Sequence, residues 1–392
     1  MTSAVILDGI RSPFGNFGGF LRDITPADLA AHVIQGAIQR CGIPGKEIQE
    51  VIVGNVLQTN GQAAYLARHA AIKAGVDVRV PALTVNRLCG SGLESVAIAA
   101  ANIQLGYSSA AVAGGVEVMS RVPHITQSIR RGVKMGNLEL EDMLTNGLFD
   151  SMAGVAMGGT AENLALDYEI SREAQDEWAL ISQTRAEKAR EAGYFAEEIA
   201  PLEVFNGREP VDFTDDEFIK GAASGKKLPS LNPAFKKDGT VTAGNSSGIN
   251  DGASAVLVAS EEFAQKNGLR PLARIRGWAS AGCRPDRMGL GPVFAIPQAL
   301  QRAGLSQSDV DLFEINEAFA AQFLAVQQEL DLDKEKTNVN GGAIALGHPL
   351  GASGNRVLLT LIRELQRRKK SIGVASLCIG GGQGIAMVVE AL

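Results

Sequence analysis

Three segments that lie far apart in the chain each place one nucleophilic or basic side chain among small residues and glycines. Cys89 lies in Asn-Arg-Leu-Cys-Gly-Ser-Gly, His348 in Gly-Gly-Ala-Ile-Ala-Leu-Gly-His-Pro, and Cys378 in Cys-Ile-Gly-Gly-Gly. Two thiols and an imidazole in such surroundings predict covalent acyl-transfer chemistry. One thiol would carry the acyl group, the histidine would activate it, and the second thiol would transfer a proton.

Cys89 follows an apolar strand and comes just before a predicted helix that begins at Gly90, Ser91 and Gly92. At the N-terminal end of a helix, the helix dipole and the unpaired backbone N–H groups stabilise a thiolate, so this position predicts a lowered pKa for the thiol. A buried structural cysteine is the alternative. The glycines favour the nucleophile, because they permit a strained turn and the close approach of a substrate.

His348 lies between Gly347 and Pro349 in a rigid turn. A single histidine is usually an ordinary surface or core residue, but this setting predicts a fixed imidazole that can take a proton from a thiol. Cys378 ends an apolar strand, and the N–H groups of the glycine loop 380–382 could bind a thioester oxygen as it gains negative charge. This loop is not a dinucleotide fingerprint, since no helix with an acidic ribose partner follows it.

Asn316 begins an Asn-Glu-Ala-Phe segment at a predicted strand-to-helix transition. It is either the N-cap of the helix or a polar anchor for a water molecule or a carbonyl oxygen. Each of these segments is ambiguous alone, and their joint presence favours the catalytic interpretation.

Composition bounds the class of protein. The chain has 392 residues, enough for two or three domains, and a net charge of −6, which disfavours a nucleic-acid surface. No apolar run approaches the roughly 20 residues of a membrane span. The four cysteines and four histidines are not spaced as metal ligands, so we expect no metal. Scattered cysteines without a signal peptide predict reduced thiols and a cytoplasmic location.

An internal resemblance predicts that a whole domain is duplicated. The stretch 37–43, Ala-Ile-Gln-Arg-Cys-Gly-Ile, matches the stretch 299–305, Ala-Leu-Gln-Arg-Ala-Gly-Leu. The same offset pairs Ser91-Gly92 with the Ser-Gly at 353–354. A common register over separate elements favours two similar α/β lobes packed face to face.

Apolar periodicity predicts alternating strands and helices in each half. The first half has predicted strands at 48–56, 82–86 and 109–116 and a helix at 90–105. The second half has predicted strands at 311–315, 337–340, 372–378 and 384–390 and helices at 317–330 and 351–369. The helix at 90–105 is nearly apolar throughout, so we expect it to lie between two sheets.

The stretch 119–249 breaks this pattern. It contains basic residues, a polar helix predicted at 172–191 with Ser171 as its N-cap, and a charged, loop-like region at 206–240. We interpret it as an insertion that covers the site and recruits a polyanionic ligand. The predicted domains are an N-terminal lobe of residues 1–118 plus 250–270, an inserted loop domain of residues 119–249, and a C-terminal lobe of residues 271–392.

Together, the segments around Cys89, Asn316, His348 and Cys378 resemble those of the thiolases, in the same order and over essentially the full length of the chain. The resemblance implies a layered α-β-α-β-α core of duplicated lobes with an inserted loop domain. It implies that His348 activates the nucleophile Cys89 and that Cys378 is the acid/base. His348, with a water held by Asn316, would form one oxyanion hole, and the N–H groups of Cys89 and Gly380 the other.

The resemblance also implies a coenzyme A (CoA) site in the loop domain. CoA would be a co-substrate, with no permanently bound cofactor. Ser247 and Ala243 lie in the segment expected to contact the pantetheine arm, and Lys220 is placed near the nucleotide. The residues expected to line the channel are Leu148, Met157, Leu231, Phe235, Met288, Ala318 and Phe319.

The implied reaction is a ping-pong acyl transfer on small acyl-CoA substrates, either cleavage of 3-ketoacyl-CoA by CoA or condensation of two acetyl-CoA. A short-chain preference for acetoacetyl-CoA is favoured. A medium- or long-chain thiolase of fatty-acid β-oxidation is the alternative, because Ala156 stands where short-chain biosynthetic members have a histidine. A non-catalytic carrier would not need two aligned thiols. We expect a homo-oligomer, a dimer or a tetramer, with residues 120–135 as an assembly arm.

Overall fold

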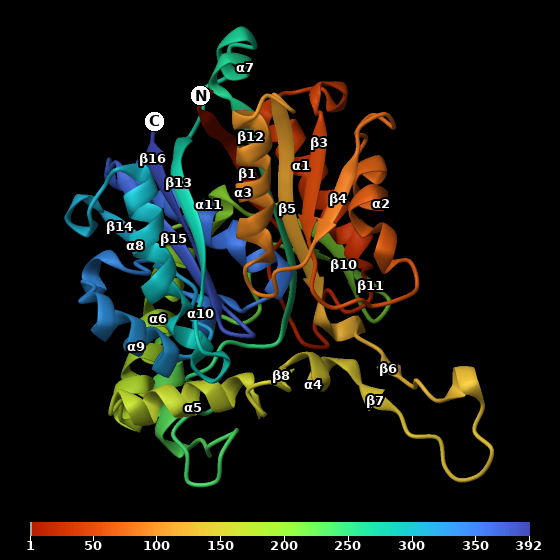
Figure 1. Ribbon diagram of the computed structural model, residues 1–392, viewed down its shortest axis with the longest axis vertical. Helices are drawn as coiled ribbons and strands as arrows, with labels where there is room; N and C mark the ends of the chain where they lie inside the picture. The colour runs from red at the N-terminus through yellow and green to blue at the C-terminus, as the bar shows by residue number, and fades with distance from the viewer. Residues whose placement is uncertain (1) are drawn as a thin grey trace.

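The computed structural model describes residues 2–392. Its main sheet has ten strands in the order β14-β15-β16-β13-β1-β12-β5-β3-β4, with β2 pairing with β12 (Figure 1). The strands are β1 Ala4–Arg11, β2 Gly15–Asn16, β3 Glu50–Gly54, β4 Ala82–Val85, β5 Ala110–Val118, β12 Asn250–Ser260, β13 Ala273–Gly282, β14 Leu312–Ile315, β15 Ile372–Ile379 and β16 Gln383–Ala391.

The strand order contains the predicted duplication. In the first half β3 and β5 are parallel, and β12 and then β1 follow in antiparallel pairing. In the second half β14 and β15 are parallel, and β16 and then β13 follow in the same way. The halves join where β1 pairs with β13 over only two residue pairs, Val5 with Arg274 and Ile6 with Ala273.

Two central helices, α3 (Ser91–Gln104) and α11 (Leu350–Arg368), pack between the inner faces of the two halves in one apolar cluster. Their first turns touch at two glycines. A Cβ on Gly354 would stand 2.1 Å from the nitrogen of Leu93, and one on Gly92 would stand 2.7 Å from the carbonyl oxygen of Gly351. No side chain fits at this crossing, and the close contact brings the loop before each helix to one place.

Outer helices complete the layers. The helices α1 (Pro26–Cys41) and α2 (Leu66–Lys73) cover the first half, and α8 (Gly291–Ala303) and α9 (Ala320–Leu330) cover the second. The helices α1 and α8 both end at a left-handed glycine, Gly42 with φ 66° and Gly304 with φ 69°, as the repeat predicts. The result is the α-β-α-β-α core expected from the sequence.

Residues 119–249 leave the sheet after β5 and return at β12. They form three hairpins and three helices, and α6 has the predicted boundaries, with Ser171 Oγ accepting the N–H of Ala174 at 3.1 Å. The elements are β6 His124–Ile125, β7 Glu141–Asp142, α4 Met143–Gly147, β8 Phe149–Asp150, β9 Val155–Ala156, α5 Met157–Asp167, α6 Arg172–Glu191, β10 Leu202–Asn206 and β11 Glu209–Phe213. The short α7 (Glu261–Lys266) and α10 (Ala343–Leu346) belong to the lobes. The exact domain boundaries stay predictions.

Two sequence predictions are wrong. The range 337–340 forms a turn with only one isolated bridge, at Thr337. The side chain of Asn338, at φ 49°, bonds both backbone groups of Ile315, at 2.7 and 2.8 Å, and so takes the place of a strand. The range 206–240 is not all loop, because it contains β11.

None of the helices within residues 2–392 has the length and apolar character needed to cross a membrane. Over the same residues, no group of three or more His, Cys, Asp or Glu side chains is arranged to hold a metal ion.

Candidate active site

Cys89 lies in a tight turn between β4 and α3. Leu88, just before it, has φ 48°, which a branched residue adopts at a cost of about 1–2 kcal/mol. The turn is held by its own side chains: Asn86 Oδ1 accepts the N–H of Leu88 at 2.9 Å, and Ser91 Oγ accepts the N–H of Arg87 at 2.8 Å and donates to the carbonyl of Leu88 at 2.7 Å. This strained turn fixes the direction of the thiol.

The predicted lowering of the Cys89 pKa is wrong. Burial raises the pKa of this thiol to about 11, and it outweighs the N–H groups of Gly380 and of Cys89 itself, which hydrogen-bond to the sulfur. A protonated thiol is a poor nucleophile at neutral pH. The site therefore needs a base.

His348 is buried and fully hydrogen-bonded. Its Nδ1 lies 2.6 Å from Ser353 Oγ, which also donates to the carbonyl of Pro349 at 2.9 Å. Because the hydroxyl proton goes to Pro349, Ser353 accepts from Nδ1–H, and Nε2 keeps its lone pair. Burial, with a contribution from the charge of Arg356, lowers the His348 pKa to about 3. The imidazole is neutral, in the tautomer that a base at Nε2 requires.

The turn that carries His348 is closed on both sides. Gly347 has φ 100°, and a Cβ there would stand 2.5 Å from Cγ of Asn250. Oδ1 of Asn250 accepts the backbone N–H of His348 at 3.0 Å. Pro349 follows and caps α11. The imidazole thus has little freedom, as the Gly-His-Pro pattern predicts.

Asn316 and Cys378 lie at the same edge of the second half-sheet, because β14 and β15 are parallel and Asn316 N–H donates to the carbonyl of Ser376 at 2.9 Å. Asn316 Nδ2 lies 3.4 Å from His348 Nε2. Its Oδ1 is buried and has no hydrogen-bond partner within the described part of the chain. Burial, and then the proximity of Cys89, raise the pKa of Cys378 well above its usual value. The two thiols and the imidazole therefore form one group.

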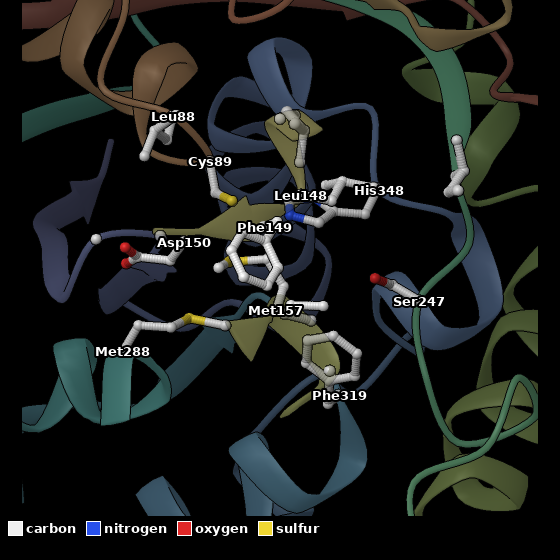
Figure 2. A pocket seen from close by; sticks show the side chains of 18 of the residues that line it. Leu88, Cys89, Leu148, Phe149, Asp150, Met157, Ser247, Met288, Phe319 and His348 are labelled. Carbon is white, nitrogen blue, oxygen red and sulfur yellow. The ribbon is translucent and has the colours of Figure 1, made fainter. Parts of the chain in front are cut away.

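An apolar cavity of about 400 Å³ lies over this group. Figure 2 shows the sulfur of Cys89 and the imidazole of His348 facing the same space. Asn316 and Cys378 do not line the cavity, but Cys378 packs in one apolar cluster with the lining residues Met288, Ala318 and Phe319. The predicted site residues that line the cavity are Cys89, Leu148, Met157, Phe235, Ser247, Met288, Ala318, Phe319, His348 and Gly380.

Three predicted CoA residues do not line the cavity. Ala243 and Lys220 are exposed, and Leu231 packs against Gly244, where a Cβ would stand 2.5 Å from its side chain. The cavity also contains residues that sequence reasoning missed, among them Leu88 and Phe149. Leu88 had one signal, its place directly before Cys89 in the glycine-rich segment, whereas Phe149 had none.

The segment with Ser247 reaches the cavity by pairing with the chain after Asn316. Ser247 N–H donates to the carbonyl of Ala318 at 3.0 Å, and Ser246 forms an isolated bridge with Phe319. This pairing places a hydroxyl at the cavity wall opposite Cys89 (Figure 2).

Comparisons with known proteins show the family of the chain. Residues 4–262 match the family model "Thiolase, N-terminal domain" and residues 269–391 match "Thiolase, C-terminal domain". The chain is 51% identical to an acetyl-CoA acetyltransferase of Escherichia coli, covering 100% of both chains. It is 49% identical to the mitochondrial 3-ketoacyl-CoA thiolase of Rattus norvegicus, covering 97% of this chain and 96% of that one.

Solved structures give the same result. The human mitochondrial 3-ketoacyl-CoA thiolase superposes with a TM-score of 0.97 at 47% identity, covering 100% of this chain and 99% of that one. A second structure of that human enzyme, in complex with CoA, has a TM-score of 0.96 at 46% identity, covering 100% and 98% of the two chains. The chain therefore belongs to the thiolase family of acyltransferases.

Proposed function

We propose that this enzyme is an acyl-CoA C-acyltransferase that works through an acyl-Cys89 intermediate. It would cleave 3-ketoacyl-CoA with CoA, or condense two acetyl-CoA in the reverse direction. One observation carries the proposal: a protonated thiol and an imidazole whose Nε2 bears a lone pair line one apolar cavity, and a second thiol, Cys378, is buried close to Cys89.

The first half-reaction breaks the bond between C2 and C3 of the substrate. His348 Nε2 takes the proton of Cys89, and the thiolate attacks the C3 carbonyl. The electron pair of the C2–C3 bond moves to the acetyl-CoA fragment, and Cys378 protonates C2. The free Oδ1 of Asn316 is suited to hold a water that, with His348, stabilises one oxyanion, and the N–H groups of Cys89 and Gly380 would stabilise the other.

The second half-reaction restores both thiols. CoA loses its proton to the Cys378 thiolate and attacks the acyl-Cys89 thioester. The Cys89 thiolate that leaves takes back the proton held by His348. All protons return to their starting groups, so the cycle requires no metal or redox cofactor, and CoA acts as a co-substrate.

CoA binding is supported by the insertion. Ser247 offers a hydroxyl at the cavity wall. Five exposed lysines of the insertion could attract the phosphates of CoA, in keeping with its predicted polyanionic ligand. They are Lys220, Lys226, Lys227, Lys236 and Lys237. A relative solved with CoA supports the same assignment.

Trapping the intermediate tests the enzyme against a non-catalytic carrier. After incubation with acetoacetyl-CoA and an acid quench, we expect a digest to contain the Cys89 peptide with an added acetyl group, at up to one per chain. Mass spectrometry measures it, and Cys283 serves as the internal control because its thiol points to the carbonyls of Arg287 and Met288. Bound CoA without an acetylated Cys89 would favour the carrier.

A short-chain preference is supported by the wall beside Cys89. Leu57, Met119, Leu144 and Leu350 form a buried apolar cluster, against which Cys89 itself packs. We expect kcat/KM for acetoacetyl-CoA to exceed that for 3-ketooctanoyl-CoA by about tenfold or more, because each unaccommodated methylene costs about 1–3 kcal/mol. Turnover on a series of chain lengths measures this. If the four-carbon substrate is the poorest, the small Ala156 opens the pocket and the β-oxidation alternative holds.

A homo-oligomer, as a dimer or tetramer, also stays a proposal, as does a cytoplasmic location. Figure 1 shows the segment around β6 and β7 extending away from the body of the molecule. It carries exposed apolar side chains, which suit contact with another copy of the chain. These are Ile129, Val133, Met135, Leu138 and Leu140.

A further inference from the structure

Glu317, directly after Asn316, is a fully buried carboxylate with four hydrogen-bond donors. Oε1 accepts from Trp178 Nε1 at 3.1 Å and from Asn338 Nδ2 at 2.9 Å. Oε2 accepts from Ser182 Oγ at 2.7 Å and from the N–H of Ile344 at 3.3 Å. Four uncharged donors fill the acceptor sites of a carboxylate, which is the condition for burying one.

The donors come from segments that are far apart in the chain. Trp178 and Ser182 are one turn apart on the same face of α6, in the insertion, and the ring of Trp178 stacks on Phe323 at 4.0 Å. Asn338 lies in the turn beside β14. Ile344 lies in α10, which ends at Leu346. The carboxylate therefore links the insertion to both catalytic segments of the C-terminal lobe.

The segment that carries His348 packs directly on the carboxylate. A Cβ on Gly342 would stand 2.3 Å from the carboxyl carbon of Glu317, and Gly342 N–H donates to Ser182 Oγ at 3.0 Å. Gln183 adds a parallel link, since its Nε2 donates to the carbonyl of Ile344 at 3.1 Å. Any shift of Glu317 therefore moves the chain that leads into His348.

We propose that Glu317 is a positioning residue for the acyl transfer: it fixes Asn316 and the segment 342–348 relative to each other and docks both on α6. The inference rests on the proposed function. Asn316 Nδ2 and His348 Nε2 are 3.4 Å apart, at the outer limit of a hydrogen bond, so a small displacement changes their geometry. A misplacement of about 1 Å can lower a rate about 100-fold.

The test is Glu317→Gln, which keeps the size of the side chain but turns an NH₂ group toward two of the donors. We expect kcat for thiolysis, divided by the number of sites that form acetyl-Cys89, to fall about 100-fold, with KM for acetoacetyl-CoA within about threefold. A purely structural role would instead lower the number of active sites or the melting temperature.

Glu198→Gln is the matched control, because Glu198 is also a buried carboxylate, bonded to Arg11 Nε at 2.8 Å and Thr360 Oγ1 at 3.0 Å, and it does not line the cavity. It should lower the melting temperature and leave kcat per acetylated site unchanged. If Glu317→Gln behaves in the same way, the proposal is wrong.

If Glu317→Gln does not fold, Trp178→Phe tests the same proposal. It removes one donor while the ring can still stack on Phe323. We expect kcat per acetylated site to fall about fivefold, consistent with one neutral hydrogen bond of about 1 kcal/mol, and an unchanged kcat would overturn the proposal. Absence of acetyl-Cys89 in the unmodified enzyme would instead refute the proposed function, so the two failures are distinguishable.

Discussion

We expect acylation of Cys89 at pH 7 to fall by about 10³- to 10⁴-fold when His348 is replaced by asparagine, because general-base catalysis contributes up to about this factor. The physical reason is the burial that raises the pKa of the Cys89 thiol to about 11, which leaves very little thiolate at neutral pH without a base. Quench-flow measurement of acetyl-Cys89 formed from acetyl-CoA gives the rate. His69→Asn is the control, since that histidine stacks on Tyr65 and does not line the cavity.

The same variant has a pH signature. A thiol with a pKa raised to about 11 is protonated below that value, so its thiolate fraction rises about tenfold per pH unit through the neutral range. The acylation rate of His348→Asn should rise with the same slope. In the unmodified enzyme burial lowers the pKa of His348, so the imidazole stays neutral across this range, its protonation state does not change with pH, and the rate should be nearly flat. A pH-independent variant would show that the helix N-terminus activates the thiol.

Replacing Cys378 with serine separates the two halves of the chemistry. Acylation of Cys89 by acetyl-CoA breaks no carbon–carbon bond. Cys378 would protonate the departing CoA in this step, but a thiolate leaves without an acid far more readily than a carbanion does, so we expect the rate to fall by no more than about tenfold. Thiolysis of acetoacetyl-CoA requires a proton at C2, and a serine hydroxyl is a far weaker acid, so turnover should fall about 10³- to 10⁴-fold. The rates of acetyl transfer and of thiolysis are measured on the same preparation. The prediction is checked by the ratio of these two rates in Cys378→Ser relative to the unmodified enzyme.

Cys283→Ala is the matched control for Cys378→Ser, because Cys283 is a half-buried thiol near Cys378 that does not line the cavity and is directed at the carbonyls of Arg287 and Met288. It should leave both rates within about twofold. Equal loss of acetyl transfer and thiolysis in Cys378→Ser would contradict a separate proton-transfer role for Cys378.

The sequence predicted the elements whose signals are local. The helix α6 has its predicted boundaries because Ser171 is a strong N-cap. The range 337–340 contains two β-branched residues, Thr337 and Val339, which are typical of strands, yet Asn338 meets β14 with its side chain. Here the hydrogen bonds to β14 come from a side chain and not from a paired strand backbone. The periodicity of the sequence cannot distinguish these two cases, so it could not have excluded the strand.

The site follows the same division. The glycines around Cys89, His348 and Cys378 predicted tight turns at the candidate catalytic residues. The fold brings these three turns together. The direction of the Cys89 pKa shift was missed because burial is a property of the packed core, which no short segment reveals. Ser353, which fixes the imidazole, had one signal: it occupies the place of Ser91 in the repeat, and each serine braces the turn of its own half.

The glycine crossing of α3 and α11 also constrains how this enzyme can evolve. Alanine in place of a helical glycine ordinarily gains up to about 1 kcal/mol of stability, but at Gly92 and Gly354 the added methyl would push the helices apart. Alanine at either position would therefore strain the contact between the two helices and separate the turns that carry Cys89 and His348. Substitutions that raise the thermal stability of this enzyme are therefore expected at other positions, for instance in the surface turns.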